Sequence, residues 1–505
     1  MTRSSFRAAP RRAVVRAGAG VISLAFLLVL GCLPQTPRTA PPTAPELPHR
    51  PENLPPFDSL VFNPPKPVVA ELPNGITLYI LEDHALPLVS VDILMRNGSQ
   101  YDPPDKPGLC SFASSVMRRG GSVDLPGDAF DDTLDFLAAP ITVETDVEFT
   151  NVRLNVMRKD LDAGLSLLAK MLLTPALPGE KLEEAKRLAR EGIRRRNDDP
   201  YEIGRRRFRQ VVYGMENPWA RQMELEDVDR ITLADLVAFH RAMYKPNITY
   251  IAVAGDIGTD EATEKIRAAF RSWERGDVPQ PSFPPTDCGM ERGVYLVEKQ
   301  VSQSAIRMGS LGMERHSPDE YAVAVMNYIF GMGTFTSRLG LEVRSNRGLA
   351  YYVFGAVFDS PDPRQGMFLA VTGTRAEKTH EAISIMRGII DSMTVLPITD
   401  EEMKTAQETI INSFVFHYAS AEQIVGQQMR LAFNGYPADY LETYIPRIRA
   451  VTKDDVTRVS GKYLRSDDMR ILVVGDRSRF DNPLDDLGPV TVLPPDDVVE
   501  MPQAQ

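Results

Sequence analysis

The sequence predicts an α+β protein built from two related domains, each a mostly antiparallel sheet covered by helices. Three observations predict this fold class: apolar alternation with hairpin turns, long amphipathic helical patterns, and an internal repeat. The repeat runs from Ile231 to Asp256 and again from Val451 to Asp476. Each copy reads as a helix with a capping threonine, a short turn and a buried strand that ends at Gly-Asp. We therefore expect one domain at 68–275 and a second at 294–480.

The elements of the first domain follow in order. The segments Val68–Leu72 and Ile76–Ile80 flank a Pro-Asn-Gly turn, which predicts a β-hairpin. A third strand is expected at Leu88–Met95, and further strands are expected within 141–157. Helical periodicity predicts two long helices, Leu161–Leu173 and Lys181–Arg196.

A helix between the third strand and the later strands has an unusual composition. Its apolar residues recur at i, i+3, i+4 and i+7, which predicts one face packed on the core: Leu109, Phe112, Ala113 and Val116. Three serines, Ser111, Ser114 and Ser115, are expected to share another face. We also expect Cys110 to face the core of the first domain.

The N-terminus has the pattern of an export signal, with arginines followed by a 14-residue apolar stretch, Ala17–Leu30. That stretch is shorter than the roughly 20 residues that span a bilayer. Small residues directly before Cys32 resemble a bacterial lipobox, so 1–31 is predicted to be a lipoprotein signal peptide and Cys32 the lipidated residue. The alternative is an ordinary signal peptide with an incidental cysteine. By resemblance to Gram-negative lipoproteins, Leu33 favours the outer membrane.

Three further segments are expected to lie outside the two domains. They are a Pro-rich tether at 32–67, a linker at 276–293 and a loosely ordered Pro- and Asp-rich tail at 481–505. No pattern pairs Cys110 with Cys288, so no disulfide framework is expected. The formal net charge of −11 makes nucleic acid an unlikely partner.

Four short motifs resemble the pitrilysin/insulinase family of zinc metallopeptidases, in its short two-domain bacterial type. They are Leu72-x-Asn74-Gly75, Gly98-Ser99, Gly108-Leu109 at the start of a helix, and the duplicated Gly-Asp ending. The resemblance covers roughly 68–476. It implies that the two domains form a clamshell around a peptide.

The same resemblance implies that the zinc site is degenerate. In the family the first helix carries His-x-x-Glu-His, and those positions match Ser111, Ser114 and Ser115 here; a later glutamate ligand matches Glu191. A catalytic zinc needs three protein ligands and an open position for water, and serine hydroxyls are poor substitutes. We therefore expect no catalytic residue, metal or other cofactor in this chain alone. The alternative for Glu191 is a solvated helix glutamate near Arg195 or Arg196.

The second domain retains a different family feature. A glycine-rich segment, Gly331–Leu339, precedes Arg344 and Tyr351, whose spacing of seven matches the family's Arg/Tyr pair. The resemblance implies that this pair donates hydrogen bonds to a bound peptide or an oxyanion. The alternative is a surface arginine and a packed tyrosine. In the first domain, the family's substrate-docking edge strand would lie near Pro140, which lacks an N–H and would damage that edge if it lies on it.

These observations lead to one main hypothesis and two alternatives. The chain is predicted to be a non-catalytic subunit that supplies Arg344 and Tyr351 in trans to a zinc-bearing partner of the same family, forming a heterodimer that acts on peptide or unfolded polypeptide. The first alternative is an autonomous peptide-binding or scaffolding lipoprotein of the cell envelope. The second is an enzyme with a serine nucleophile at Ser111 or Ser115, although neither serine has an adjacent base in the sequence.

Overall fold

The structure is a computed structural model that describes residues 62–281, 283–284, 289–360 and 366–496. The predicted signal peptide, Cys32, most of the tether and Cys288 lie outside these residues. The described end of the tether is not free, because Phe62 packs against Phe414 and Tyr418 with ring centroids 5.1 and 5.0 Å apart. The ammonium of Lys66 also lies 2.6 Å from a carboxylate oxygen of Glu442.

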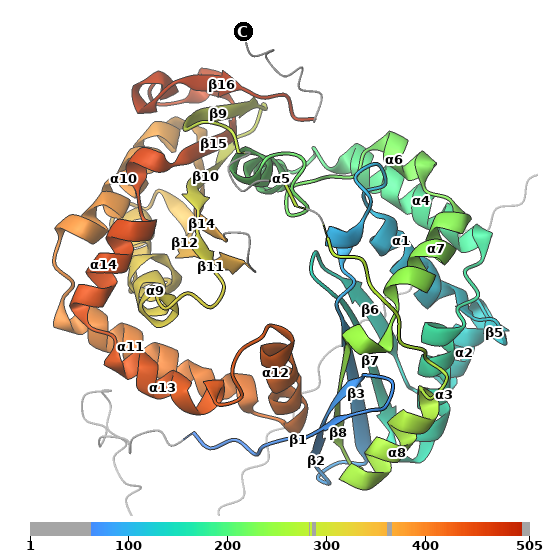
Figure 1. Cartoon of the computed structure of the whole chain (residues 1–505). Helices are drawn as coiled ribbons and strands as arrows, with labels where there is room; N and C mark the ends of the chain where they lie inside the picture. Colours follow the sequence, from blue (N-terminus) through green and yellow to red (C-terminus); the bar gives the residue numbers. More distant parts are fainter. Residues whose placement is uncertain (1–61, 282, 285–288, 361–365, 497–505) are drawn as a thin grey trace, which may run out of the picture. The chain divides into compact units, whose positions relative to one another are not determined.

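The first sheet has six strands in the order β1-β2-β8-β3-β7-β6 (Figure 1). Its strands are β1 (Val68–Glu71), β2 (Thr77–Glu82), β3 (Leu88–Met95), β6 (Ile141–Thr145), β7 (Thr150–Met157) and β8 (Thr249–Gly255). Only the β2–β8 pair is parallel within this sheet. The predicted hairpin and the third strand are confirmed, and Gly75 turns the hairpin at φ 91°.

The second sheet also has six strands, in the order β12-β14-β10-β15-β9-β16. Its strands are β9 (Gly293–Glu298), β10 (Gln303–Leu311), β12 (Ala350–Val357), β14 (Met367–Arg375), β15 (Arg470–Gly475) and β16 (Val490–Val492). The β12–β14, β14–β10 and β10–β15 pairs are antiparallel, whereas β9 runs parallel to β15 and β16. Two small two-stranded pairs complete the strands: β4 (Gly121–Ser122) with β5 (Leu125–Pro126), and β11 (Met313–Glu314) with β13 (Asp359–Ser360).

The prediction of a loosely ordered tail is wrong for the described residues 481–496. Strand β16 adds to the second sheet beside β9, and Leu484 and Leu493 are buried. The carboxylate of Asp481 accepts hydrogen bonds from the backbone N–H groups of His380 and Glu381, at 2.8 and 2.9 Å. Apolar side chains spaced between the prolines and aspartates therefore anchor this segment.

Helices cover both sheets. Those from the first half of the chain are α1 (Leu109–Gly120), α2 (Asp128–Phe136), α3 (Leu161–Leu173), α4 (Gly179–Arg195), α5 (Pro200–Tyr213), α6 (Leu225–Arg230), α7 (Leu233–Met243) and α8 (Thr259–Ala269). Those from the second half are α9 (Glu320–Asn327), α10 (Thr379–Val395), α11 (Asp400–Phe414), α12 (Ala421–Phe433), α13 (Tyr440–Ala450) and α14 (Lys453–Tyr463). The predicted α+β architecture with two sheets is confirmed.

The internal repeat is confirmed as matching pairs of helix and strand. Thr232 caps α7 by accepting the N–H of Asp235, and Thr452 caps α14 by accepting the N–H of Asp455. The strands that follow, β8 and β15, hold equivalent places next to β3 and β10 in their sheets. The two halves therefore share a folding unit.

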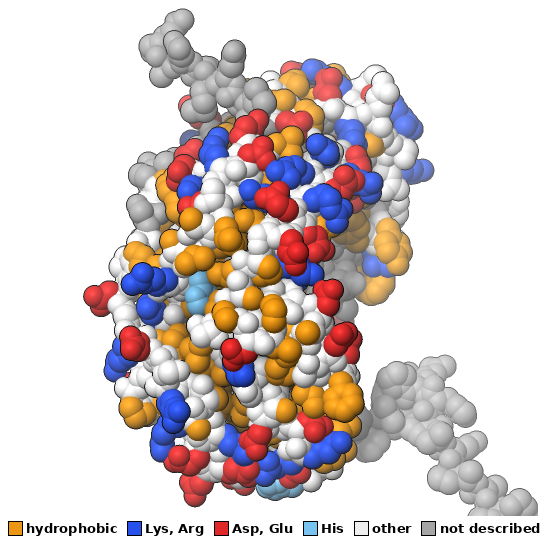
Figure 2. Space-filling model, turned by 90° about the vertical axis from the view of Figure 1, so that its right-hand side faces the viewer, with side chains coloured by type: hydrophobic (Ala, Val, Ile, Leu, Met, Phe, Trp, Pro, Cys, Tyr) orange, Lys and Arg blue, Asp and Glu red, His pale blue; other side chains and the backbone are white. Residues whose placement is uncertain are grey.

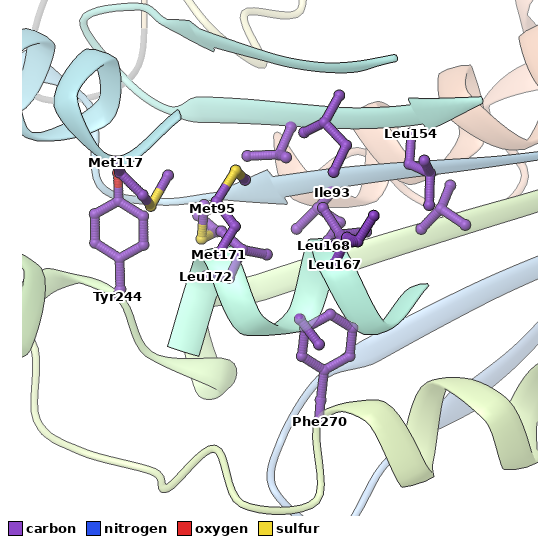
Figure 3. Close-up of a cluster of buried hydrophobic side chains, with 14 of the residues drawn as sticks. Ile93, Met95, Met117, Leu154, Leu167, Leu168, Met171, Leu172, Tyr244 and Phe270 are labelled. Atoms are coloured by element: carbon purple, nitrogen blue, oxygen red, sulfur yellow. The ribbon is translucent and has the colours of Figure 1, made fainter. Parts of the chain in front are cut away.

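Apolar side chains fill the space between the first sheet and its helices (Figure 3). In that cluster Ile93 and Met95 of β3 meet Leu168 and Met171 of α3, all of them fully buried. The prediction that Leu109, Phe112, Ala113 and Val116 of α1 face this core is confirmed, as is the burial of Cys110. These contacts fix α1, the helix with the three serines, against the sheet.

One helix from each half of the chain packs on the sheet of the other half (Figure 1). Helix α5 lies on β10 and β15 of the second sheet, where Ile203 and Phe208 join a buried cluster with Val474. Helix α12 lies on β8 and β2 of the first sheet, where Met429 and Phe433 are buried. Each sheet is therefore completed by a segment from the other half.

The outward face of the first sheet's helices has a mixed surface. Figure 2 shows hydrophobic side chains among interspersed acidic and basic ones on this face. Helix α7 contributes Leu233 and Val237, which are both exposed. No single described helix is long and apolar enough to cross a membrane, although the bent pair Ala376–Val395 and Asp400–Tyr418 passes that test on length and composition alone.

Candidate functional site

The three serines of α1 differ in exposure to solvent. Ser111 is exposed and Ser115 is half-buried, but Ser114 is buried, with its hydroxyl 3.0 Å from the phenol oxygen of Tyr244. The reason is that α7 packs against α1 and brings the following Tyr244 over the fourth position of the motif. Helical spacing keeps the three serines on one side of α1, but α7 covers the middle of that side.

Within the described segments, no general base contacts Ser114. Burial raises the pKa of the Tyr244 phenol above its usual range. The ring of His240 stacks on Tyr244 at 4.6 Å, but its Nε2–H donates to the carbonyl of Leu172 at 2.8 Å, and burial lowers the pKa of its imidazole. The contacts of Ser114 therefore do not include an activating base.

The predicted zinc position Glu191 is exposed on α4. Its carboxylate forms an ion pair with Arg195 one turn later, with a distance of 2.6 Å from Oε1 to Nε. Helix α4 does pack on α1, and Arg119 Nη1 lies 3.3 Å from Glu184 Oε1 between them. Within the described ranges, no group of three or more His, Cys, Asp or Glu side chains could hold a metal ion. Serine hydroxyls and an ion-paired glutamate do not fit a catalytic zinc.

A buried carboxylate at the start of α1 was missed by the sequence analysis. Asp102 accepts the backbone N–H groups of Gly108 and Cys110 at 2.8 and 2.7 Å, which caps the helix. Burial raises the pKa of Asp102 to about 6. The Cys110 thiol, also buried, donates to the carbonyl of Asn97 at 3.0 Å, and burial raises its pKa well above the usual range. The aspartate's place six residues before Gly108 was the only sequence clue.

Arg344 and Tyr351 lie close together in the second half of the chain. The Arg344 guanidinium lies 4.2 Å from the ring centroid of Phe335 and 5.0 Å from that of Tyr351. Tyr351 is 85% exposed and Phe335 is 57% exposed. Among the residues that the structure describes, the Arg344 side chain has no ion pair or hydrogen bond. Its donors are therefore held in place by aromatic rings and remain available.

Backbone contacts of the glycine-rich segment position this pair. A Cβ on Gly331 would lie 2.5 Å from the backbone nitrogen of Gly355 in β12, and one on Gly340 would lie 1.6 Å from the carbonyl oxygen of Thr334. These close approaches require glycine. They hold the loop that carries Phe335 against the strand that carries Tyr351.

A β-bulge aims the side chains of β12. Ala350 pairs with Thr374 and Val353 pairs with Thr372, so the strand has an extra residue between these pairs. The bulge contains Tyr351 and Tyr352, and both side chains are exposed. Bulges of this kind redirect side chains and interrupt regular pairing.

Pro140 does not damage the free edge of the first sheet. It directly precedes β6, which is the edge strand. Its carbonyl accepts the N–H of Asn155 at 3.4 Å, so the position of its missing N–H faces β7 rather than the open edge. The outward carbonyl of Ile141 instead accepts a hydrogen bond from Arg118 Nε at 2.6 Å. The condition under which Pro140 would damage this edge is therefore not met.

Comparisons with known proteins agree with this architecture. Residues 79–216 match the model of the insulinase family (Peptidase family M16), and residues 230–410 match the model described as the Peptidase M16 inactive domain. An uncharacterized zinc protease from Streptomyces coelicolor is 23% identical over 402 residues, which cover 77% of this chain and 85% of that protein. The non-peptidase homolog YmxG from Helicobacter pylori is 19% identical over 403 residues, which cover 79% of this chain and 91% of that protein.

Solved structures share the fold. The crystal structure of the peptidase M16 inactive domain from Pseudomonas fluorescens has a TM-score of 0.74 at 24% identity and covers 83% of this chain and 100% of that chain. A chain of Complex III2 from Candida albicans has a TM-score of 0.66 at 15% identity, covering 83% and 98%, so the fold also occurs within a multi-subunit complex. The two matching models together span more than half of the chain. The chain belongs to the insulinase family of peptidases, family M16, as an inactive, peptidase-like member.

Proposed function

We propose that this protein is the non-catalytic subunit of a two-chain zinc peptidase of its family, binding peptide and supplying Arg344 and Tyr351 in trans. The observation that carries the proposal is the Arg344 guanidinium, which is ordered by two aromatic rings yet has no polar partner among the described residues. An arginine held this way is prepared to bind something from outside the chain.

The chemistry of the pair suits a peptide under attack. The Arg344 guanidinium and the Tyr351 phenol can each donate a hydrogen bond to a carbonyl oxygen, and such bonds strengthen as negative charge develops on that oxygen. The replacement of the zinc motif by Ser111, Ser114 and Ser115, and the ion pair of Glu191, support a division of labour in which a partner subunit of the same family holds the zinc.

The free edge of the first sheet gives this subunit a place for an extended peptide. In β6 the backbone groups of Val143 and Thr145 point away from β7, because alternate residues face opposite sides of a strand. An extended peptide could pair with such an edge by β-strand addition. A lipid on Cys32 would tether the subunit to the cell envelope, most simply at the outer membrane.

Two measurements test the proposal in order. The first is affinity purification of the tagged, full-length lipoprotein from a detergent extract, with mass spectrometry of co-purifying chains. We expect a near-stoichiometric partner that carries His-x-x-Glu-His. The second is peptide cleavage by that complex when Arg344 is replaced by alanine. The rate should fall by about 10²–10³, as for loss of one oxyanion donor, while assembly is retained.

The matched control is Arg347→Ala. Arg347 lies three residues away and is half-exposed, but its guanidinium is already paired with Glu342 at 2.5 Å. This control should cleave at the wild-type rate. A complex with Arg344→Ala that assembles and cleaves as fast as the control complex would show that the in-trans role is wrong.

A second candidate function is an autonomous peptide-binding or scaffolding lipoprotein with no proteolytic role. The free edge of β6 and the absence of a metal-holding group among the described residues support it. Recovery of the chain alone, or only with envelope proteins that lack the zinc motif, would favour this candidate.

A further inference from the structure

Two arginines lie on the side of the second sheet covered by α5 without an ion-pair partner among the described residues. Arg209 of α5 and Arg307 of β10 are both half-buried, and neither forms an ion pair or a hydrogen bond through its side chain within the part of the chain that the structure describes. Their neighbour Arg205 differs, since its Nη2 lies 2.6 Å from the Glu202 carboxylate. Removing part of a guanidinium from water without a partner costs free energy, which a bound anion would recover.

The packing of α5 brings these charges together. Arg205 and Arg209 are one helical turn apart on α5, and that helix lies across β10. The side chain of Arg307 runs past Gly204 of α5, where a Cβ would be 3.3 Å from the Arg307 Nε. The glycine leaves the room that the guanidinium occupies.

The electrostatics show an excess of positive charge. Burial lowers the pKa of both Arg209 and Arg307, and the charge of Arg205 lowers each pKa further. The carboxylates that act on the cluster are already engaged: Glu202 pairs with Arg205, and Asp146 accepts the backbone N–H of Val147. Glu202 and Asp146 therefore offset only part of the burial of Arg209 and Arg307, and neither forms an ion pair with them among the described residues.

Two tyrosines border the cluster and connect it to the proposed peptide site. The rings of Tyr201 and Tyr352 are 5.9 Å apart, and the phenol of Tyr201 donates to Gln303 Oε1 at 3.1 Å. Tyr352 interacts electrostatically with Arg307 and shares its β-bulge with Tyr351. The arginine cluster and the Arg344–Tyr351 pair thus adjoin the same bulge of β12.

We propose that Arg209 and Arg307 form a carboxylate-binding subsite, so that the peptides bound by this protein carry an aspartate or glutamate side chain there. A guanidinium binds a carboxylate through paired N–H donors, and such bonds are about twice as strong as neutral ones. Arg205 and the Tyr201 and Tyr352 rings border the subsite. The inference rests on the proposed peptide binding and specifies its substrate class: acidic rather than basic peptides.

The test compares three fluorescent peptides on the purified full-length protein by anisotropy. One contains glutamates and has an amidated C-terminus; the second has glutamine in place of each glutamate; the third is the glutamine peptide with a free C-terminal carboxylate. Each is titrated on wild type, on the double variant Arg209→Gln/Arg307→Gln and on Arg267→Gln. The last is a matched control, because Arg267 is an exposed helical arginine paired with Glu264 on the same helix, α8.

The glutamate peptide should bind the double variant at least about tenfold more weakly than wild type or the control, while the amidated glutamine peptide is unaffected. If the free C-terminal carboxylate alone restores binding to wild type, the subsite recognises a chain end rather than a side chain, and the side-chain assignment is wrong. Equal binding of the glutamate peptide to wild type and the double variant would overturn the subsite.

A second readout separates this inference from the proposed peptide binding. Glutarate, compared with chloride at equal ionic strength, should raise the unfolding temperature of wild type and of the control but not of the double variant. If wild type bound no peptide yet glutarate still acted through the two arginines, the proposed peptide binding would fail and the carboxylate subsite would stand. Glutarate effects that are equal in all three proteins would count against the subsite. Because the variant removes unpaired charges, it should not unfold at a lower temperature than wild type in chloride.

Discussion

Replacing Phe433 by alanine should lower the free energy of unfolding by about 4–5 kcal/mol, in the upper half of the range for buried phenylalanines. Phe433 is the last residue of α12 and is 1% exposed on the first sheet. Its ring makes edge-to-face contacts with Phe149 and Tyr250, at 6.1 and 5.5 Å, and the Arg96 guanidinium lies 4.1 Å from its centroid. These contacts account for part of that loss in free energy of unfolding, of order 0.5–1.5 kcal/mol for each aromatic pair.

The assay is urea unfolding followed by tryptophan fluorescence and far-UV circular dichroism. Trp273 lies in the core of the first sheet, and Trp219 packs on the α5 cluster of the second sheet. In a Trp219→Phe background the fluorescence therefore reports on Trp273 alone. Because α12 comes from the second half of the chain and packs on the first sheet, both probes should shift to the same lower midpoint. Phe416→Ala, at a side chain that is 73% exposed, should change stability by less than about 0.5 kcal/mol. A loss below about 2 kcal/mol for Phe433→Ala, or a shift confined to Trp273, would refute the reasoning.

Three other perturbations follow from the same structure. Because burial raises the folded pKa of Asp102 to about 6, wild type should lose stability as the pH rises from about 4 to about 6, and Asp102→Asn should remove that part of the slope in urea unfolding at a series of pH values. Burial alone would raise the pKa of Asp319, but bonds from Lys462, Arg458 and Tyr463 outweigh it and hold the pKa at about 2. Asp319→Asn should therefore cost about 1–2 kcal/mol at pH 7, and the difference from wild type should vanish as the pH falls towards about 2. Gly340→Ala would place a Cβ 1.6 Å from the Thr334 carbonyl and should cost more than about 2 kcal/mol in thermal unfolding, whereas Gly388→Ala on the open face of α10 should be neutral or stabilising.

Local sequence patterns were enough to predict individual elements. The strand Leu88–Met95 and the helix Leu161–Leu173 match the structure at both ends. Each has a continuous apolar or helical pattern bounded by turn residues, so neighbouring residues determine where it begins and ends. Arg344 and Tyr351 were identified by resemblance to a family motif, and the contact between their side chains was not predicted.

Contacts between distant segments were not predictable in the same way. Helical spacing gives the angle of Ser114 on α1, but Tyr244 covers it from 130 residues further along the chain. The three-residue strand β16 has too little pattern of its own, and its pairing with β9 stabilises it. Arg209 and Arg307 lie on separate elements, and their shared surface exists only because α5 crosses to the second sheet.

That crossing of α5, together with the opposite crossing of α12, sets limits on how the protein can be divided. A gene split at the linker would give two polypeptides. Each would lack the helix that covers its own sheet and would carry the helix that covers the sheet of the other. Each fragment would expose an apolar sheet face, with Leu94 and Ala254 uncovered on one and Val297 and Val474 on the other. Expressed singly, such fragments would be prone to aggregate; expressed together, they could reconstitute the fold by exchanging helices. The duplicated unit therefore forms a pair of mutually dependent halves rather than two autonomous domains.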